Sequence, residues 1–372
     1  MKFLDCVIVN PKISLKKGKV YPFIEMANVS TSYREPLLIE YKSFDSGAKF
    51  QDGDTVIARI TPCLQNGKRF YCKNIGTGFG STEYLVFRPK NKLVNNLFLY
   101  YFMQTEFIKL QMINSMVGAT GRQRVNNNVF NDIKLNLPDI KIQKNIGKTL
   151  SAYDDLIENN QKQIKLLEEA AQRLYKDWFV DLRFPGYEKT PIIDGVPEGW
   201  EEEEINKIFN IKYGKTLPTN KIKNSGKYPV YGANGIIGYY NQKNCNDYVV
   251  LITSRGNGSG EVSITHDKEA FVTNNSFIIM PVNDLIKLPF TYQLMKTINF
   301  KRICTGSAQP QLTNKSINIL KVVLPSDELV LKFCQYTEIY YEKIENLLSQ
   351  NKRLIEARDR LLTKLMSGEI EV

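Results

Sequence analysis

A repeat at a constant offset of 187 residues constrains the fold of this chain more than any other feature. Residues 125–138 read VNNNVFNDIKLNLP, and residues 312–325 read LTNKSINILKVVLP. The residues that are identical in this register are Asn127 and Asn314, Asn131 and Asn318, Lys134 and Lys321, Leu137 and Leu324, and Pro138 and Pro325. The register continues to Leu174 and Leu361. The chain therefore contains two copies of one unit, each with its own core.

Each copy ends in a long segment with an apolar heptad pattern. We expect the helices to begin after Pro138 and Pro325, with Asp139 and Ser326 as N-caps. Each would run for about 40 residues, or about 60 Å at 1.5 Å per residue. The two helices are expected to pack against each other as an antiparallel coiled coil.

Both helices have apolar and polar positions in the expected seam. The apolar members are Ile157, Ile164, Leu167, Ala171 and Leu174 in the first helix, and Ile344, Leu347, Leu354, Leu361 and Leu365 in the second. Asn160, Asn351 and Arg358 are polar members of this seam. Polar seam residues typically fix the register of a coiled coil.

The segments 1–137 and 201–324 carry short β-type runs broken by Gly, Asn and Pro. The expected strands are Asp54–Ile60, Glu83–Phe87, Tyr248–Thr253 and Ser276–Met280, and the expected helices are Leu97–Met112 and Leu288–Thr297. The predicted fold is α+β, with two mixed globular domains joined by the two long helices in a pseudo-twofold repeat. The expected domains are 1–138, the first helix with a Pro- and Gly-rich connector at 139–195, the second globular domain at 196–325, and the second helix at 326–372.

The positive charge of the chain lies on the globular segments. The net charge is +11 over residues 1–150, −4 over 151–200, +4 over 201–330 and zero over 331–372. Basic surfaces favour polyanions, because binding releases counterions from nucleic acid. A membrane-surface helix would instead concentrate the charge on a helix.

Compartment and metal chemistry follow from the cysteines, the histidine and the absence of long apolar runs. Six scattered cysteines without a CxxC pair predict reduced thiols, and no apolar run is long enough for a membrane span or a secretory signal. We therefore expect a cytoplasmic protein. His266 is the single histidine, which disfavours metal or triad chemistry.

Motifs for catalysis are missing from the sequence. No Pro-Pro dipeptide occurs, so there is no [DN]PP[YF] loop for amino methylation, and there is no GxxxxGK[ST] phosphate loop. Gly76-Thr77-Gly78 is interpreted as a turn. The acidic run Glu201–Glu204 is expected to be a solvated face or a helix start. The chain is predicted to be non-catalytic and to bind no cofactor itself.

Base recognition needs polar side chains on loops that fit a groove of DNA. The predicted DNA-binding residues of the first domain are Lys12, Lys16, Lys17, Arg59, Gln65, Asn66, Lys68, Arg69, Arg122, Gln123 and Arg124. Those of the second domain are Tyr213, Lys215, Asn234, Tyr240, Arg255, Asn257, Ser259, Gln309, Gln311 and Lys315. The loops GATGRQRV and TGSAQPQL occupy matching repeat positions with different side chains, as expected if one scaffold reads two sequences.

The chain resembles the specificity subunits of type I restriction-modification enzymes over essentially its whole length. The motifs that carry the resemblance are LYKDWFVD at 174–181, VPEGW at 196–200 and LLTKLMSGEI at 361–370. The first domain departs from the pattern because it has no VPEGW-like start. Before Phe79 the two domains correspond poorly, apart from KVYP at 19–22 and KYP at 227–229.

The resemblance implies that each globular domain is a target-recognition domain for one half of a bipartite, asymmetric DNA site. It implies that the helices set the spacer, since about 60 Å corresponds to roughly 18 base pairs of 3.4 Å. It also implies docking of two methylation subunits with S-adenosylmethionine, and through them of restriction subunits that use ATP and Mg. Leu348, Ile355 and Leu362 lie outside the seam and are either docking residues or further helix packing.

Two other interpretations stay open at this stage. One is a single-chain methyltransferase or nuclease, which the missing catalytic loops disfavour. The other is a protein-binding coiled-coil scaffold without DNA readout, which the basic globular segments disfavour.

Overall fold

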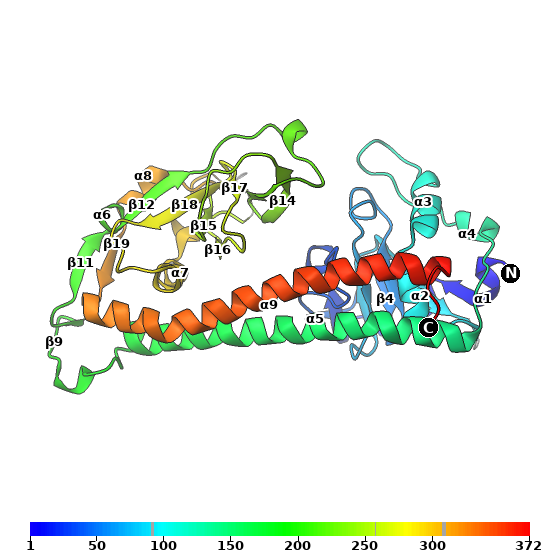
Figure 1. Ribbon diagram of the computed structural model, residues 1–372, viewed down its shortest axis with the longest axis horizontal. Coiled ribbons are helices and arrows are strands. Elements are labelled where there is room, and N and C mark those ends of the chain that lie inside the picture. The colour runs from blue at the N-terminus through cyan, green and yellow to red at the C-terminus, as the bar shows by residue number, and fades with distance from the viewer. Residues whose placement is uncertain (91–92, 257, 307–309) are drawn as a thin grey trace. The chain divides into compact units, whose positions relative to one another are not determined.

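The computed structural model describes residues 1–372 except 91–92, 257 and 307–309. The chain forms two compact units: the first contains Met1–Lys162 and Ser349–Val372, and the second contains Gln163–Leu348. The boundary between the units falls inside two long helices, α5 (Ile140–Tyr175) and α9 (Asp327–Ser367). Each unit therefore holds one globular region and part of both helices (Figure 1).

Two four-stranded sheets and short helices form the globular region of the first unit. The strands are β1 (Val7–Val9), β2 (Val20–Ile24), β3 (Glu40–Ser43), β4 (Ala48–Phe50), β5 (Thr55–Ala58), β6 (Arg69–Tyr71), β7 (Gly78–Gly80) and β8 (Tyr84–Pro89). The helices are α1 (Phe3–Cys6), α2 (Asn96–Phe102), α3 (Glu106–Asn114) and α4 (Val129–Asp132). The strand orders are β1-β8-β5-β6 and β3-β2-β7-β4, and β2 and β7 pair in parallel.

The second unit repeats this plan. Its strands are β9 (Ile192–Ile193), β10 (Val196–Pro197), β11 (Glu201–Glu204), β12 (Phe209–Tyr213), β13 (Tyr228–Gly232), β14 (Gly235–Tyr240), β15 (Val250–Thr253), β16 (Val262–Ile264), β17 (Phe271–Val272), β18 (Ser276–Pro281) and β19 (Lys321–Leu324). Its helices are α6 (Ile205–Ile208), α7 (Leu288–Thr297) and α8 (Asn314–Asn318). The main sheets have the orders β12-β18-β15-β16 and β14-β13-β17, with β13 and β17 parallel.

The first sheets of the two units match strand by strand, with β1, β8, β5 and β6 corresponding to β12, β18, β15 and β16. In the second sheets β3, β2 and β7 correspond to β14, β13 and β17. The registers agree as well, since Val7 lies opposite Pro89 and Phe209 lies opposite Pro281. The predicted fold, two mixed domains in one repeat with two long helices, is confirmed.

The long helices begin where the sequence predicts. The carbonyl of Asp139 accepts the Gln143 amide at 2.9 Å, and the carbonyl of Ser326 accepts the Val330 amide at 3.1 Å. The helices have 36 and 41 residues, and a π-helical turn at Lys176–Val180 extends the first.

The two helices run antiparallel within the first unit. Leu150 and Leu365 belong to one apolar core, and the Asn160 amide donates to Asn351 Oδ1 at 2.9 Å. Later residues of α5 therefore lie beside earlier residues of α9. Among the predicted seam residues, Ile157, Ala171, Ile344, Leu347 and Leu365 are buried, and Ile164, Leu167, Leu174, Leu354 and Leu361 are half-buried.

In the second unit, aromatic side chains join the helices to the globular region. The ring of Phe333 on α9 lies 5.6 Å from that of Tyr175, 5.3 Å from that of Phe179 and 6.1 Å from that of Phe290 on α7. Trp178 belongs to the same core. Aromatic pairs at such distances add to the stabilisation that burial alone provides.

Two predicted elements differ from the structure. The expected helix Leu97–Met112 is divided into α2 and α3, because the Thr105 hydroxyl bonds the Phe102 carbonyl and Thr105 becomes the N-cap of α3. The run Glu201–Glu204 is solvated in part but is a strand and not a helix start, since β11 pairs with β19. In the first unit, Met1 pairs likewise with Leu135.

Candidate nucleic-acid interface

Two loops that the sequence separates by more than fifty residues lie together in the first unit. The loop after β5 and the loop 118–125 are joined by backbone bonds from Val125 N to Arg59 O and from Thr61 N to Gln123 O, both 2.9 Å. Ile60 and Arg124 form a β-bridge between them. The two predicted recognition loops therefore form one surface.

The same arrangement occurs in the second unit. Leu312 N donates to Ser254 O at 2.9 Å, and Arg255 forms a β-bridge with Gln311. Gly256 N donates to Pro310 O at 3.2 Å. Matching backbone bonds thus hold the loops of both repeats, while the side chains on those loops differ.

Several predicted DNA-binding side chains of the first unit are presented to solvent. Lys12, Lys16, Gln65, Asn66 and Arg122 are exposed, and within the described residues their side chains form no internal hydrogen bond or ion pair. These side chains remain available to a ligand.

Other predicted residues of the first unit are engaged within the protein. Lys68 Nζ donates to the Met26 carbonyl at 2.7 Å, and Arg69 Nη1 donates to Thr31 and Gly67 carbonyls at 3.0 and 2.8 Å. Gln123 is half-buried, and Lys17 pairs with Asp45. Lys68 and Arg69 hold the loop rather than project from it.

Arg124 is held by a carboxylate that the sequence does not single out. Its Nε and Nη2 atoms bond both oxygens of Glu83 at 2.7–3.0 Å. The hydrogen bonds and charge of Glu83 hold the pKa of Arg124 above its ordinary value. The guanidinium is therefore oriented before any ligand arrives.

The predicted residues of the second unit divide in the same way. Lys215, Asn234, Arg255 and Lys315 are exposed, and Gln311 is half-buried. Tyr213 packs on Phe277, Tyr240 packs on Phe271 and Ser259 donates to the Pro310 carbonyl. Asn257 and Gln309 lie outside the described residues.

Among known protein families, a profile of the type I restriction modification DNA specificity domain matches residues 8–169 and 197–348, one copy in each repeat. The chain belongs to the family of type I restriction-modification specificity subunits.

Relatives in this family include the MjaIX specificity subunit of Methanocaldococcus jannaschii, 25% identical over 76% of this chain and 71% of that protein. The HindI specificity subunit of Haemophilus influenzae is 23% identical over 86% of both chains. The crystal structure of a type I S subunit from M. genitalium has a TM-score of 0.51, with 20% identity, over 98% of this chain and 95% of that one. That structure supports the fold alone.

Buried ion pairs attach the first globular region of this family member to its helices. Arg34, which is 1% exposed, bonds Glu158 on α5 through Nε at 2.7 Å and Nη2 at 2.6 Å, and Ser151 through Nη1 at 2.7 Å. Burial opposes the charged form, but Glu158 and Asp155 hold the pKa of Arg34 above its ordinary value. Sequence patterns gave no signal for Arg34, because it lies in a loop far from its partners in the sequence.

A second buried pair lies in the helical seam. Arg358 of α9 bonds Asp154 of α5 at 2.5 Å and the Ser32 carbonyl at 2.9 Å. The Tyr101 hydroxyl donates to the other oxygen of Asp154. The polar seam position predicted at Arg358 therefore links both helices and the globular region.

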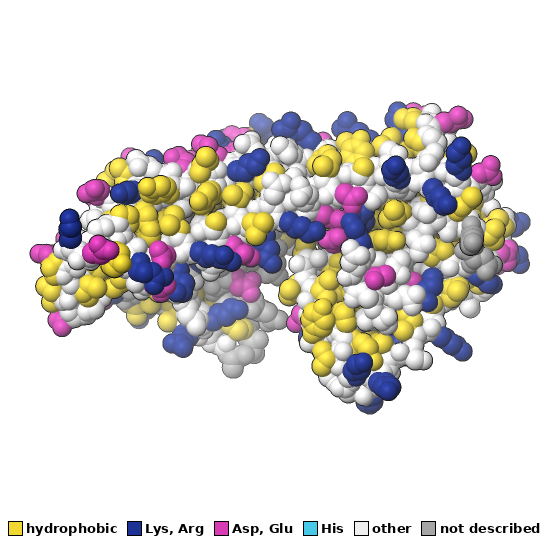
Figure 2. Space-filling view, turned by 90° about the horizontal axis from the view of Figure 1, so that it is seen from below, with side chains coloured by type: hydrophobic (Ala, Val, Ile, Leu, Met, Phe, Trp, Pro, Cys, Tyr) yellow, Lys and Arg dark blue, Asp and Glu magenta, His cyan; other side chains and the backbone are white. Residues whose placement is uncertain are grey.

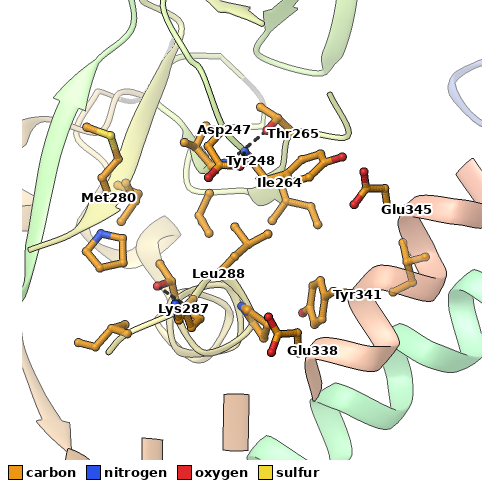
Figure 3. A pocket seen from close by; sticks show the side chains of 18 of the residues that line it. Asp247, Tyr248, Ile264, Thr265, Met280, Lys287, Leu288, Glu338, Tyr341 and Glu345 are labelled. Atoms are coloured by element: carbon orange, nitrogen blue, oxygen red, sulfur yellow. Dashed lines mark hydrogen bonds between the residues drawn. The ribbon is translucent and has the colours of Figure 1, made fainter. Parts of the chain in front are cut away.

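A cavity of ≈ 560 Å³ lies within the second unit, beside α9 (Figure 3). Figure 3 shows Glu338, Tyr341 and Glu345 of α9 across from Ile264 and Leu288. Its carboxylates belong to Asp247, Asp284, Glu338, Glu342 and Glu345, against the single lysine Lys287. The excess of carboxylates over cations on this rim disfavours a polyanionic ligand in the cavity.

Charge is mixed on the face shown in Figure 2, where basic, acidic and apolar side chains are interspersed. Among the described residues, no helix is long and apolar enough to cross a membrane. Within the same residues, no cluster of three or more His, Cys, Asp or Glu is placed to hold a metal.

Proposed function

We propose that each globular region reads one half of a bipartite, asymmetric DNA target in a type I restriction-modification complex. The observation that carries this proposal is the pair of loops that matching backbone bonds hold together in each repeat. Val125 N to Arg59 O corresponds to Leu312 N to Ser254 O. One scaffold with two sets of side chains suits two different half-sites.

The side chains on these loops have the chemistry that base reading requires. Arg122 and Arg124 in the first unit suit guanine, whose O6 and N7 accept two hydrogen bonds. Asn234 and Gln311 in the second unit suit adenine, whose N6 and N7 form a donor and acceptor pair. The excess positive charge of both globular segments supports backbone contacts.

We propose that α5 and α9 set the distance between the half-sites. With 36 and 41 residues, the helices are about 54 and 62 Å long at 1.5 Å per residue. Their polar pairs fix the register of the two helices. This span suits two short half-sites separated by unread base pairs.

We propose that the helices also dock two methylation subunits, through which the restriction subunits join. The acidic cavity beside α9 suits an apolar segment with basic flanks on a methylation subunit, because Leu348 lines it and Glu338, Glu342 and Glu345 are exposed. Ile355 is half-buried, whereas Leu362 is 9% exposed within the first unit's core and is unsuited to docking. Glu342→Lys is expected to reduce co-purification of the methylation subunit, with Glu356→Lys as control; equal recovery would contradict this docking site.

In this proposal the chain is non-catalytic and confers specificity in the cytoplasm. Adenine modification with S-adenosylmethionine, and DNA cleavage with ATP and Mg, belong to the partner subunits. The loops contact DNA through hydrogen bonds and charge, and they take part in no covalent step.

Loop variants test the two-reader proposal. Arg124→Ala and Gln311→Ala should each relax one half of the methylated motif, as mapped by sequencing modified adenines after co-expression with the methylation subunit. Each lost base contact is worth about 1–3 kcal/mol of discrimination. Lys189→Ala, an exposed residue of the connector, is the control. Simultaneous loss of both halves in either variant would contradict separate readers.

A further inference from the structure

A groove lined by three cations lies in the first unit, outside the predicted loops for the most part. It has a volume of ≈ 570 Å³, and Lys12, Lys49 and Arg59 line it together with uncharged residues. No carboxylate is among the residues that line it. Within the described part of the chain, none of these three cations has an ion-pair partner, whereas Lys17, Arg88 and Arg124 all do.

Arg59 makes few hydrogen bonds within the protein. Its Nη2 atom makes one long bond of 3.4 Å to the Val125 carbonyl. Its Nε atom is buried and has no partner among the described residues. A buried guanidinium donor without an acceptor is costly unless a ligand supplies one.

The groove adjoins the recognition loops. The Arg59 carbonyl accepts the Val125 amide at 2.9 Å, and the Arg59 amide donates to Glu83 O at 2.8 Å, next to the Glu83 side chain that holds Arg124. A ligand in the groove therefore lies beside the loop that presents Arg122 and Arg124.

We propose that this groove binds a backbone phosphodiester of the half-site that the first domain reads. The inference rests on the proposed function and adds a phosphate-binding site, formed by Lys12, Lys49 and Arg59, to it. Three cations and no carboxylate line this groove, which favours an anionic ligand, and Lys and Arg are the usual partners of DNA phosphates. Ser14 and Thr82, which also line the groove, supply hydroxyl donors of the kind that bond phosphate oxygens.

The wall of the groove is fixed by the backbone. Gly47 lines it with φ +136°, and a Cβ at Gly47 would lie 2.2 Å from the Gly80 carbonyl oxygen. This close approach needs glycine and holds β4, which carries Lys49, against β7. The lysine is thus presented from a sheet and not from a free loop.

Two of the three cations of the groove, Arg59 and Lys49, have no cationic counterpart among the described residues of the second unit. Ser254 replaces Arg59, since their amides and carbonyls make matching backbone bonds. The register that matches β1 with β12 ends at Val9 in the first unit, so it assigns Lys12 no counterpart on β12. Among the described residues, the β14-β13-β17 sheet has no strand matching β4. The groove therefore distinguishes the first reader from the second.

Salt dependence of DNA binding tests this inference on the full complex with methylation subunits. The probe is a duplex with the mapped target, and the variants are Lys12→Ala, Lys49→Ala and the double variant. Each single change should reduce the slope of log K against log salt by about 0.9, and the double by about twice that, with the motif unchanged. Lys42→Ala, on β3 at the opposite edge of the same sheet and paired with Glu40, is the control and should keep the slope.

Methylphosphonate duplexes locate the contact. When the phosphates of the half-site that Arg124→Ala relaxes are made neutral, wild type and Lys49→Ala should have the same slope of log K against log salt. When the phosphates of the other half-site are made neutral, the two slopes should still differ. If both lysine variants keep the wild-type slope and still recognise the target, the groove does not bind a backbone phosphate, and the proposed function is unaffected. Stabilisation of wild type but not Lys49→Ala by inorganic phosphate, with no change in DNA slope, would instead show a free-anion site and overturn the proposal.

Discussion

At the scale of single residues, the strongest constraint is the buried ion pair between Arg358 and Asp154. Both side chains are about 1% exposed, and Arg358 also bonds the Ser32 carbonyl while Tyr101 bonds Asp154. Removing one partner of such a pair leaves an uncompensated charge in the interior. The pair therefore holds the first globular region in a defined place on its helices.

Arg358→Ala is expected to destabilise the first unit by about 3–5 kcal/mol, measured by urea unfolding of the full chain. Arg360→Ala, an exposed residue of the same helix, should change the free energy of unfolding by no more than about 0.5 kcal/mol. The double change Arg358→Met and Asp154→Leu should recover part of the loss, the remainder coming from the unpaired Tyr101 hydroxyl. A loss below about 1 kcal/mol in Arg358→Ala would contradict this role.

The sequence predicts which loops carry the candidate DNA-binding residues, but not whether each side chain projects from its loop. Gly, Asn and Arg at strand ends indicate where loops lie, and the backbone then brings two of them together. Whether a cation projects, as Arg122 does, or folds back on a carbonyl, as Lys68 and Arg69 do, depends on acceptors from distant segments. Lys49, which lines the proposed phosphate groove, lies on a short strand, where sequence alone gives no reason to expect a ligand contact.

At the scale of elements, the long helices were the most predictable part of the fold. A heptad pattern, a preceding proline and a capping residue act locally, so both helix starts could be read from neighbouring residues. The division of α2 from α3 and the pairing of β11 with β19 depend on tertiary contacts, so they could not be predicted from neighbouring residues. The Asn160–Asn351 pair was predictable in part. The sequence predicts that both residues lie in the seam between the helices, and the structure shows that they form a hydrogen bond with each other.

Asn351→Leu alone should destabilise the protein by about 1–3 kcal/mol, because it leaves the Asn160 amide buried without its partner. Replacing both residues by leucine should instead raise the melting temperature while weakening the control of helix register. Asn159→Leu, at an exposed position, is the matched control. Thermal unfolding by circular dichroism measures all of them, and a double variant less stable than Asn351→Leu would rule out this account of the pair.

At the scale of the whole molecule, the chain contains two copies of one unit, and each copy has a globular region followed by a long helix. Matching strand orders and matching loop bonds make the two globular regions equivalent scaffolds. In the proposed function, their differences, Arg122 to Arg124 in one loop and Gln311 in the other, give each globular region its own base preference.

Lengthening both helices tests the proposed spacer. Seven residues inserted between Lys162 and Gln163 and seven between Leu348 and Ser349 keep the heptad pattern and add about 10.5 Å, or about three base pairs. Methylation mapping should give the same half-sites with a spacer longer by that amount. An insertion in one helix only should disrupt the pairing of the helices and reduce methylation. An unchanged spacer in the double insertion would contradict the proposal that the helices set the distance between the half-sites.

The central claim, that this chain confers a two-part DNA specificity, is tested most directly by mapping methylated adenines. The chain is co-expressed with its methylation subunit in a host without adenine methylation, and the genome is sequenced for modified bases. The account predicts an asymmetric motif of two parts separated by a fixed number of unread base pairs. A soluble complex that leaves no modified adenine would contradict it.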